Sequence, residues 1–191
     1  MRLYHFTALI HLPAITREGL RIGLVPINPT ASIAEINAVN LTTNPSPAAQ
    51  TFWCRGIVNK TKIRMTVEVP DVDLTSFRQI IQQYKMRSSW VKALDPYYER
   101  RHWYFAFGGV SVEQIKKVEL FENRIYRELR TDEQRELVAR IDGERKETFL
   151  FTTITSGPQA GYEAFAFKKG HSGSWLLDGD VNVSEEPLAA A

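Results

Sequence analysis

The chain has 191 residues, 43% of them hydrophobic, and its 24 basic and 22 acidic residues leave a formal net charge of +2. A charge so close to neutral produces no strong field that would steer nucleic acid or an anionic membrane. A single cysteine excludes an internal disulfide and any multi-cysteine metal site, and no apolar run approaches the roughly 18 residues that span a bilayer. We therefore expect a cytoplasmic protein with one substantial core and no membrane partner.

The first predicted strand, residues 2–7, carries a His-x-Thr pair. Because side chains alternate along a strand, His5 and Thr7 should leave the same face of the sheet. A short helix follows, with Pro13 at its first position and Gly19 as its stop signal. The pattern suits a polar site at the start of the domain, and it is equally compatible with a half-buried strand histidine that binds no ligand.

A second predicted strand, residues 38–43, ends in short polar side chains. Thr42 and Thr43 precede an Asn-Pro turn signal, and Ser46 follows it. Hydroxyl and amide groups at the end of a strand suit recognition of a ribose or an amide. Threonine also favours strands for its shape alone, so an ordinary strand end remains the alternative.

The remaining elements up to residue 122 are short strands and helices without a regular βαβ repeat. They are a loop over 23–37, strands over 63–69, 102–107 and 118–121, helices over 75–86 and 89–94, and a single helical turn over 111–114. The absence of strict alternation predicts an α+β fold with a mixed, mostly antiparallel sheet and short helices.

The last third of the chain begins with a helix, expected from Thr131 to about Ile141 and stopped by Gly143. Three short strands should follow, over 147–154, 162–168 and 174–183. So short a segment forms a weak core by itself. The expected organisation is an α+β domain over 1–126, a helix plus a small β-rich appendage docked on it over 127–183, and a disordered tail over 184–191.

Three segments together resemble the ADP-ribosyltransferase-like superfamily. Tyr4-His5-Phe6-Thr7 is similar to the His-Gly-Thr triplet of poly(ADP-ribose) polymerases, with Phe6 in place of the glycine. Residues 39–46 resemble the second strand of that superfamily. Residues 103–115 resemble a strand and Val-Pro-x-Glu-x-Ile segment of toxins that ADP-ribosylate DNA, and a similar stretch of RNA 2′-phosphotransferases. The resemblance covers residues 1–122 and implies an ADP-ribosyltransferase-like fold that uses NAD.

The resemblance also implies which side chains would hold the cofactor. The first segment would contact the ribose and nicotinamide ends of NAD, with the backbone beside Phe6 approaching the nicotinamide amide. The second segment would wall the nicotinamide pocket. The implied NAD-binding residues are His5, Phe6, Thr7, Thr42, Thr43 and Ser46.

The catalytic glutamate of these transferases has no direct counterpart, because His102, Trp103 and Tyr104 stand at its usual place. In the superfamily this carboxylate stabilises the oxocarbenium-like cation that forms as nicotinamide leaves. Glu99 is the nearest carboxylate in the sequence, and Glu68 on its strand is a second candidate. We assign the catalytic roles to Glu99 and Tyr104.

Two functions of different classes remain open. The first is an NAD-dependent ADP-ribosyltransferase or NAD glycohydrolase that acts on nucleic acid or a protein partner. The alternative is a non-catalytic binding or inhibitor module on the same scaffold. Basic and aromatic residues interleave between Tyr84 and Trp103, which suits either stacking of single-stranded nucleic acid or snorkelling side chains over a core. The four histidines are dispersed, so no metal site is predicted.

Overall fold

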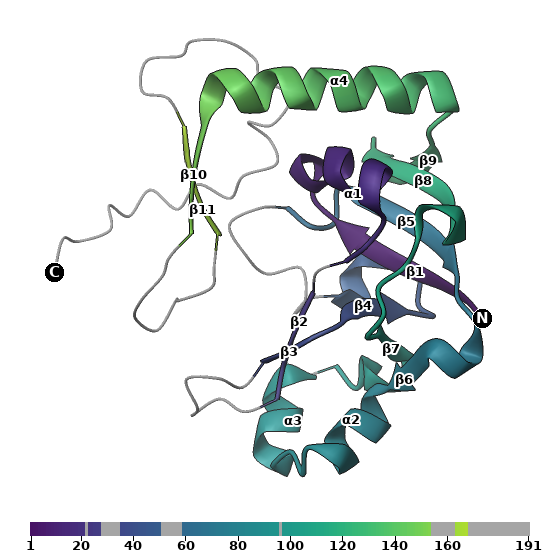
Figure 1. Ribbon diagram of the computed structural model, residues 1–191. Helices are drawn as coiled ribbons and strands as arrows, with labels where there is room; N and C mark the ends of the chain where they lie inside the picture. The colour runs from purple at the N-terminus through teal and green to yellow at the C-terminus, as the bar shows by residue number, and fades with distance from the viewer. Residues whose placement is uncertain (22, 28–34, 51–58, 96, 154–162, 168–191) are drawn as a thin grey trace, which may run out of the picture.

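A computed structural model describes residues 1–21, 23–27, 35–50, 59–95, 97–153 and 163–167. Its centre is a seven-stranded antiparallel sheet in the order β6-β7-β4-β1-β5-β8-β9 (Figure 1). The strands are β1 Arg2–Thr7, β4 Val39–Thr42, β5 Ile63–Glu68, β6 Leu74–Ser76, β7 Trp103–Ala106, β8 Ile115–Glu122 and β9 Ile125–Glu128. The expected α+β class is therefore confirmed.

Four α-helices and several short 3-10 turns connect the strands in the described part of the chain. The α-helices are α1 Leu12–Glu18, α2 Phe77–Gln83, α3 Ser88–Leu94 and α4 Thr131–Thr148. The 3-10 turns are η1 Leu9–His11, η2 Pro47–Gln50, η3 Asp71–Asp73, η4 Glu99–His102 and η5 Val112–Gln114. Two separate two-stranded ribbons pair β2 Leu24–Pro26 with β3 Glu35–Asn37, and β10 Phe149–Thr153 with β11 Glu163–Phe167.

The helices bury the two faces of the sheet in two clusters. The α1 and α4 side chains, among them Ile15 and Ile141, join Leu3, Met65 and Val67 of the central strands in the larger cluster. In the smaller cluster, apolar residues of α2 and α3 pack on β7. The helices contribute Phe77, Ile80, Val91 and Leu94, and the strand contributes Trp103 and Phe105. Alternation along each strand separates the two sets, so each face of the sheet has its own core.

Two strands of the sheet are absent from the sequence prediction. The edge strand β6 has only three residues, too few to display a period of two. The edge strand β9 follows β8 through a two-residue turn in which Asn123 and Arg124 have φ of 49° and 67°. Positive φ at both turn residues matches the twist of a hairpin, but Asn-Arg lacks the glycine that usually marks such a turn. The predicted loop over 23–37 also contains the β2–β3 ribbon.

Helix α4 does not stop at Gly143, as the sequence predicted, but continues to Thr148. A Cβ atom added at Gly143 would meet nothing within 4 Å, so no close packing requires a glycine there. A glycine inside a helix costs only about 1 kcal/mol relative to alanine. Tertiary packing outweighs that cost, since Ile141 is completely buried in the larger cluster.

Other expectations for the C-terminal third stay predictions. The β10–β11 pair corresponds to the first two expected strands, whereas the third strand over 174–183 and the tail over 184–191 lie outside the described residues. The boundary at residue 126 and the docking of the appendage likewise remain predictions. In the described ranges, no helix is long and apolar enough to cross a membrane.

Candidate functional site

The first two segments of the predicted site are neighbours in the sheet. Strand β1 pairs with β4 in antiparallel register, with Tyr4 opposite Thr42. Because side chains alternate, His5 and Thr43, the residues next to this pair, leave the other face of the sheet together. From the spacing of residues and strands, their Cα atoms lie roughly 8 Å apart. The fold therefore places both residues on one face.

The His5 ring is half-buried and anchored to the neighbouring strand. Its Nδ1 lies 2.9 Å from the carbonyl oxygen of Asn40. A carbonyl only accepts, so Nδ1 carries the proton and Nε2 keeps a lone pair. Burial lowers the pKa of His5 to about 4, the Asn40 bond opposes the shift, and Lys60 adds to it. His5 is therefore a neutral hydrogen-bond acceptor at neutral pH.

This pKa predicts an acid-sensitive contribution to stability. The folded-state pKa of about 4 lies below the ordinary value of 6.5, so the unfolded chain binds more protons and stability falls as the pH drops from about 6.5 to about 4. The difference corresponds to about 3 kcal/mol. The test variant is His5→Asn, which keeps a donor for the Asn40 carbonyl. Urea unfolding at neutral pH and at about pH 4 measures how much free energy of unfolding each protein loses on acidification. The variant should lose less than the wild type, by up to about 3 kcal/mol. Equal acid losses would contradict the prediction.

The neighbours of His5 in β1 have different environments. Thr7 is buried on the same face as His5. The Phe6 side chain leaves the opposite face, where its ring packs edge-on against Tyr126 with centroids 6.1 Å apart. Tyr104 lies in β7 opposite Leu41 of β4, half-buried against the larger core cluster. The strand registers therefore place Thr7 and Tyr104 on the His5 face of the sheet and Phe6 on the opposite face.

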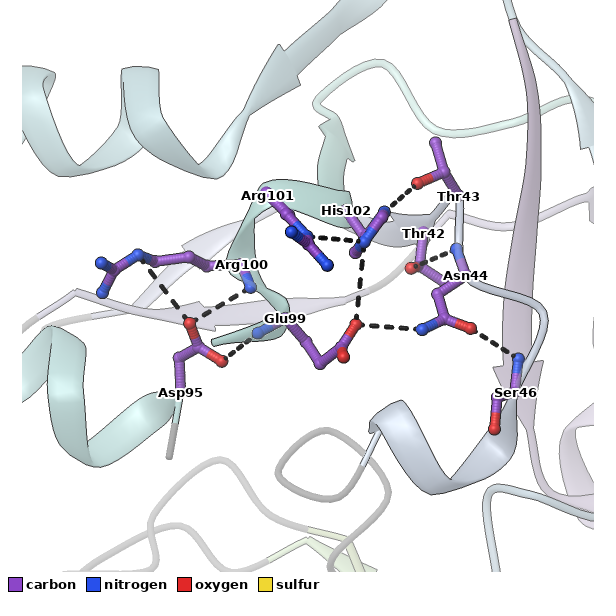
Figure 2. Close-up of polar contacts among 9 residues, drawn as sticks. All are labelled: Thr42, Thr43, Asn44, Ser46, Asp95, Glu99, Arg100, Arg101 and His102. Carbon is purple, nitrogen blue, oxygen red and sulfur yellow. Dashed lines mark hydrogen bonds and ion pairs between the residues drawn. The ribbon is translucent and has the colours of Figure 1, made fainter. Parts of the chain in front are cut away.

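A group of polar residues lies where β4 ends and β7 begins, and we call it the Glu99 cluster (Figure 2). It combines the segment after β4 with the η4 turn that leads into β7. Its nine members are Thr42, Thr43, Asn44, Ser46, Asp95, Glu99, Arg100, Arg101 and His102. Four predicted site residues, Thr42, Thr43, Ser46 and Glu99, thus meet in one place.

Asp95 fixes the turn that carries Glu99. Its side chain is 1% exposed, and its carboxylate accepts the backbone N–H groups of Glu99 at 2.6 Å and of Arg100 at 3.2 Å. The Arg100 guanidinium lies 3.8 Å from the same carboxylate. Tyr98 enters the turn with a left-handed φ of 60°. A buried carboxylate that binds two successive amides holds a backbone turn firmly.

Asn44 connects the end of β4 to Glu99. Its side-chain amide donates to Oε2 of Glu99 at 3.0 Å. The backbone N–H of Asn44 donates to Oγ1 of Thr42, and Oδ1 of Asn44 accepts from the backbone N–H of Ser46, both at 3.0 Å. The Glu99 side chain is 22% exposed, and among the described residues its Oε1 has no hydrogen-bond partner. The bond from Asn44 thus orients the carboxylate through Oε2, while no described residue occupies Oε1.

His102 and Arg101 complete the cluster, although the sequence predicted no role for either residue. Nδ1 of His102 lies 2.7 Å from Oγ1 of Thr43, and its Nε2 accepts from Nε of Arg101 at 3.0 Å. The same Nε2 lies 4.0 Å from Oε2 of Glu99. Their position directly after Glu99 in the chain was the available signal. The second carboxylate candidate, Glu68, lies outside the cluster and pairs with Arg2.

The structure does not join every predicted residue. In the described part of the chain no hydrogen bond or ion pair links His5 to Glu99. Two surface hollows lie away from the Glu99 cluster, one of about 200 Å³ beside α1, α4 and β8 and one beside Met1. Of the candidate residues, Glu68 alone lines either of these two hollows, the one beside Met1. The nicotinamide pocket that the resemblance implies therefore stays a prediction. No group of three or more His, Cys, Asp or Glu side chains suited to a metal occurs in the described ranges.

Comparison of the chain with protein-family models, with curated proteins and with solved structures finds no match.

Proposed function

We propose that this protein is an NAD-dependent ADP-ribosyltransferase or NAD glycohydrolase. The observation that carries the proposal is the meeting of Glu99 with the end of β4, through the 3.0 Å bond from Asn44. Among the described residues, the half-buried Glu99 carboxylate has one oxygen without a hydrogen-bond partner, and His102 lies between it and the hydroxyl group of Thr43. This arrangement suits a ligand that carries hydroxyl groups and develops positive charge. NAD has both properties.

In the proposed cleavage of NAD, each predicted site residue has its own role. NAD supplies a glycosidic bond whose cleavage sends the bonding electron pair away with nicotinamide and leaves positive charge on the ribose. The negative Glu99 carboxylate would favour that charge by electrostatic attraction. The neutral His5 would accept a hydrogen bond from a ribose hydroxyl through Nε2. Thr42, Thr43 and Ser46 would form the wall of the nicotinamide site.

Exposed aromatic and basic side chains beside Glu99 support nucleic acid as the acceptor. Tyr97 and Tyr98 are 61% and 64% exposed, and the Arg100 guanidinium lies 6.0 Å from the Tyr98 ring centre. Aromatic rings can stack unpaired bases while arginine contacts phosphate. A protein side chain is the other acceptor class, and labelling with each acceptor in the presence of NAD would separate the two.

The direct test is release of nicotinamide from NAD by the purified protein. His5→Ala should raise the NAD dissociation constant about threefold to tenfold, because it removes one hydrogen bond in a partly desolvated site. The matched control is His11→Ala, which removes a histidine from η1 and should leave the affinity for NAD unchanged. Calorimetry measures both affinities.

The alternative function gives a different pattern in the same assays. A non-catalytic module would bind a partner without releasing nicotinamide, in keeping with the lack of a glutamate at the usual strand position. Absence of both nicotinamide release and calorimetric NAD binding at millimolar concentration would reject the NAD proposal and leave the binding module.

A further inference from the structure

Three side chains of the Glu99 cluster form a continuous hydrogen-bonded chain (Figure 2). Nε of Arg101 donates to Nε2 of His102 at 3.0 Å, and Nδ1 of His102 lies 2.7 Å from Oγ1 of Thr43. The backbone holds the last pair in place, because the N–H of Thr43 donates to the carbonyl of His102 at 3.0 Å. The direction of each bond follows from the chemistry of the first donor.

A guanidinium group is always protonated and can only donate. Nε2 of His102 must therefore supply a lone pair to Arg101, and the single proton of a neutral imidazole lies on Nδ1. This N–H donates to Oγ1 of Thr43. The hydroxyl hydrogen of Thr43 is then not used by His102 and can point toward a ligand.

Protonation of His102 does not reverse this direction. The imidazolium would carry a proton on Nε2, which repels Arg101 and faces Oε2 of Glu99 at 4.0 Å. Its Nδ1 would still donate to Thr43. In the imidazolium, Nδ1 always carries a proton, and in the neutral ring Arg101 keeps the proton on Nδ1. In both charge states the Thr43 hydroxyl hydrogen therefore stays available to a ligand.

We propose that Arg101 is a positioning residue that fixes the tautomer of His102 and thereby makes the Thr43 hydroxyl a hydrogen-bond donor to an acceptor oxygen of the ligand. Only the identity of the ligand rests on the proposed function. In NAD, such an oxygen belongs to the nicotinamide carboxamide or to the pyrophosphate. Thr43 thus favours a ligand group that accepts a hydrogen bond over a group that can only donate one.

The tautomer can be measured on the ligand-free protein by ¹⁵N NMR of the imidazole nitrogens, under conditions where the spectrum itself shows the neutral ring. His102→Asn assigns the resonances. The wild type should show the Nδ1–H form. Arg101→Leu should shift His102 toward the Nε2–H form, because Glu99 becomes the remaining partner of Nε2, whereas Arg101→Lys should preserve the wild-type form.

Arg78→Leu is the matched control, since it removes the same charge from an exposed position on α2. It should leave the His102 signals unchanged. A wild-type protein with the Nε2–H form, or an Arg101→Leu variant with the wild-type spectrum, would overturn the inference. Neither result depends on whether the protein binds NAD.

Two fragments of NAD identify the acceptor oxygen. Nicotinamide and ADP-ribose are titrated separately into the wild type, Thr43→Val and Thr43→Ser. Thr43→Val should weaken one fragment about threefold to tenfold, and Thr43→Ser should retain wild-type affinity. Unchanged affinity of Thr43→Val for both fragments would overturn the donor role. If neither fragment binds the wild type, the NAD proposal fails, while the tautomer measurement still decides the role of Arg101.

Discussion

Replacing Glu99 by glutamine is expected to slow nicotinamide release by about 10²- to 10³-fold while leaving the affinity for NAD nearly unchanged. The glutamine side chain keeps the shape of the residue, and its amide oxygen can still accept from Asn44, which lies 3.0 Å from Oε2 of Glu99. The substitution removes the negative charge that favours the cation formed as nicotinamide leaves. Single-turnover release and calorimetric binding of NAD measure the two effects separately.

Glu68→Gln is the matched control for this prediction. Glu68 lies at the end of β5, where its carboxylate is 3.3 Å from Arg2 and away from the Glu99 cluster. The Glu68→Gln variant should release nicotinamide at the wild-type rate. If Glu99→Gln retained that rate and Glu68→Gln lost it, the catalytic carboxylate would be Glu68 and the assignment made from the η4 turn would be wrong.

Arg64 connects the sheet to the loop from Asn44 to Ser46, and its loss is expected to destabilise the fold strongly. Its Nε and Nη2 donate to the two carboxylate oxygens of Glu119, each at 2.8 Å, and Nη1 donates to the carbonyl of Pro45 at 2.9 Å. The guanidinium carbon lies 4.2 Å from the ring centre of Tyr126 and 5.4 Å from that of Tyr4. The bond to Glu119 raises the pKa of Arg64 above its ordinary value.

Arg64→Met should lower the free energy of unfolding by about 3–5 kcal/mol, because it leaves the Glu119 charge largely buried without its partner. The two side chains are only 17% and 13% exposed. Loss of the bond to Pro45 also frees the loop between Asn44 and Ser46. Urea denaturation measures the stability, and nicotinamide release reports whether the loop still positions Glu99.

Two further variants separate the buried charge from simple loss of packing. The double variant Arg64→Met/Glu119→Leu should recover most of the lost stability, since neither charge remains buried. Arg2→Met removes an arginine from an exposed pair on the same sheet and should cost about 1 kcal/mol or less. A double variant as unstable as Arg64→Met would show that stacking on the tyrosines, rather than the ion pair, provides the stability.

The elements with local sequence signals could be predicted from the amino-acid sequence. Period-two alternation over residues 63–69 predicted β5, and Pro13 and Gly19 predicted the limits of α1. The His5 and Thr43 placement on one face followed once β1 and β4 were paired. The predicted end of α4 at Gly143 was wrong. A glycine expresses only the backbone preference of one residue, and the burial of Ile141 outweighed that preference.

Only the tertiary structure decided which polar groups meet. Asn44 and Glu99 are 55 residues apart in the chain, as are Arg64 and Glu119, and no spacing rule relates them. Strand order brings β4 beside β7 and β5 beside β8, and that order depends on the combined burial of both sheet faces. The direction of the hydrogen bonds from Arg101 to Thr43 also emerges only there, because a histidine tautomer is selected by the partners that surround the ring.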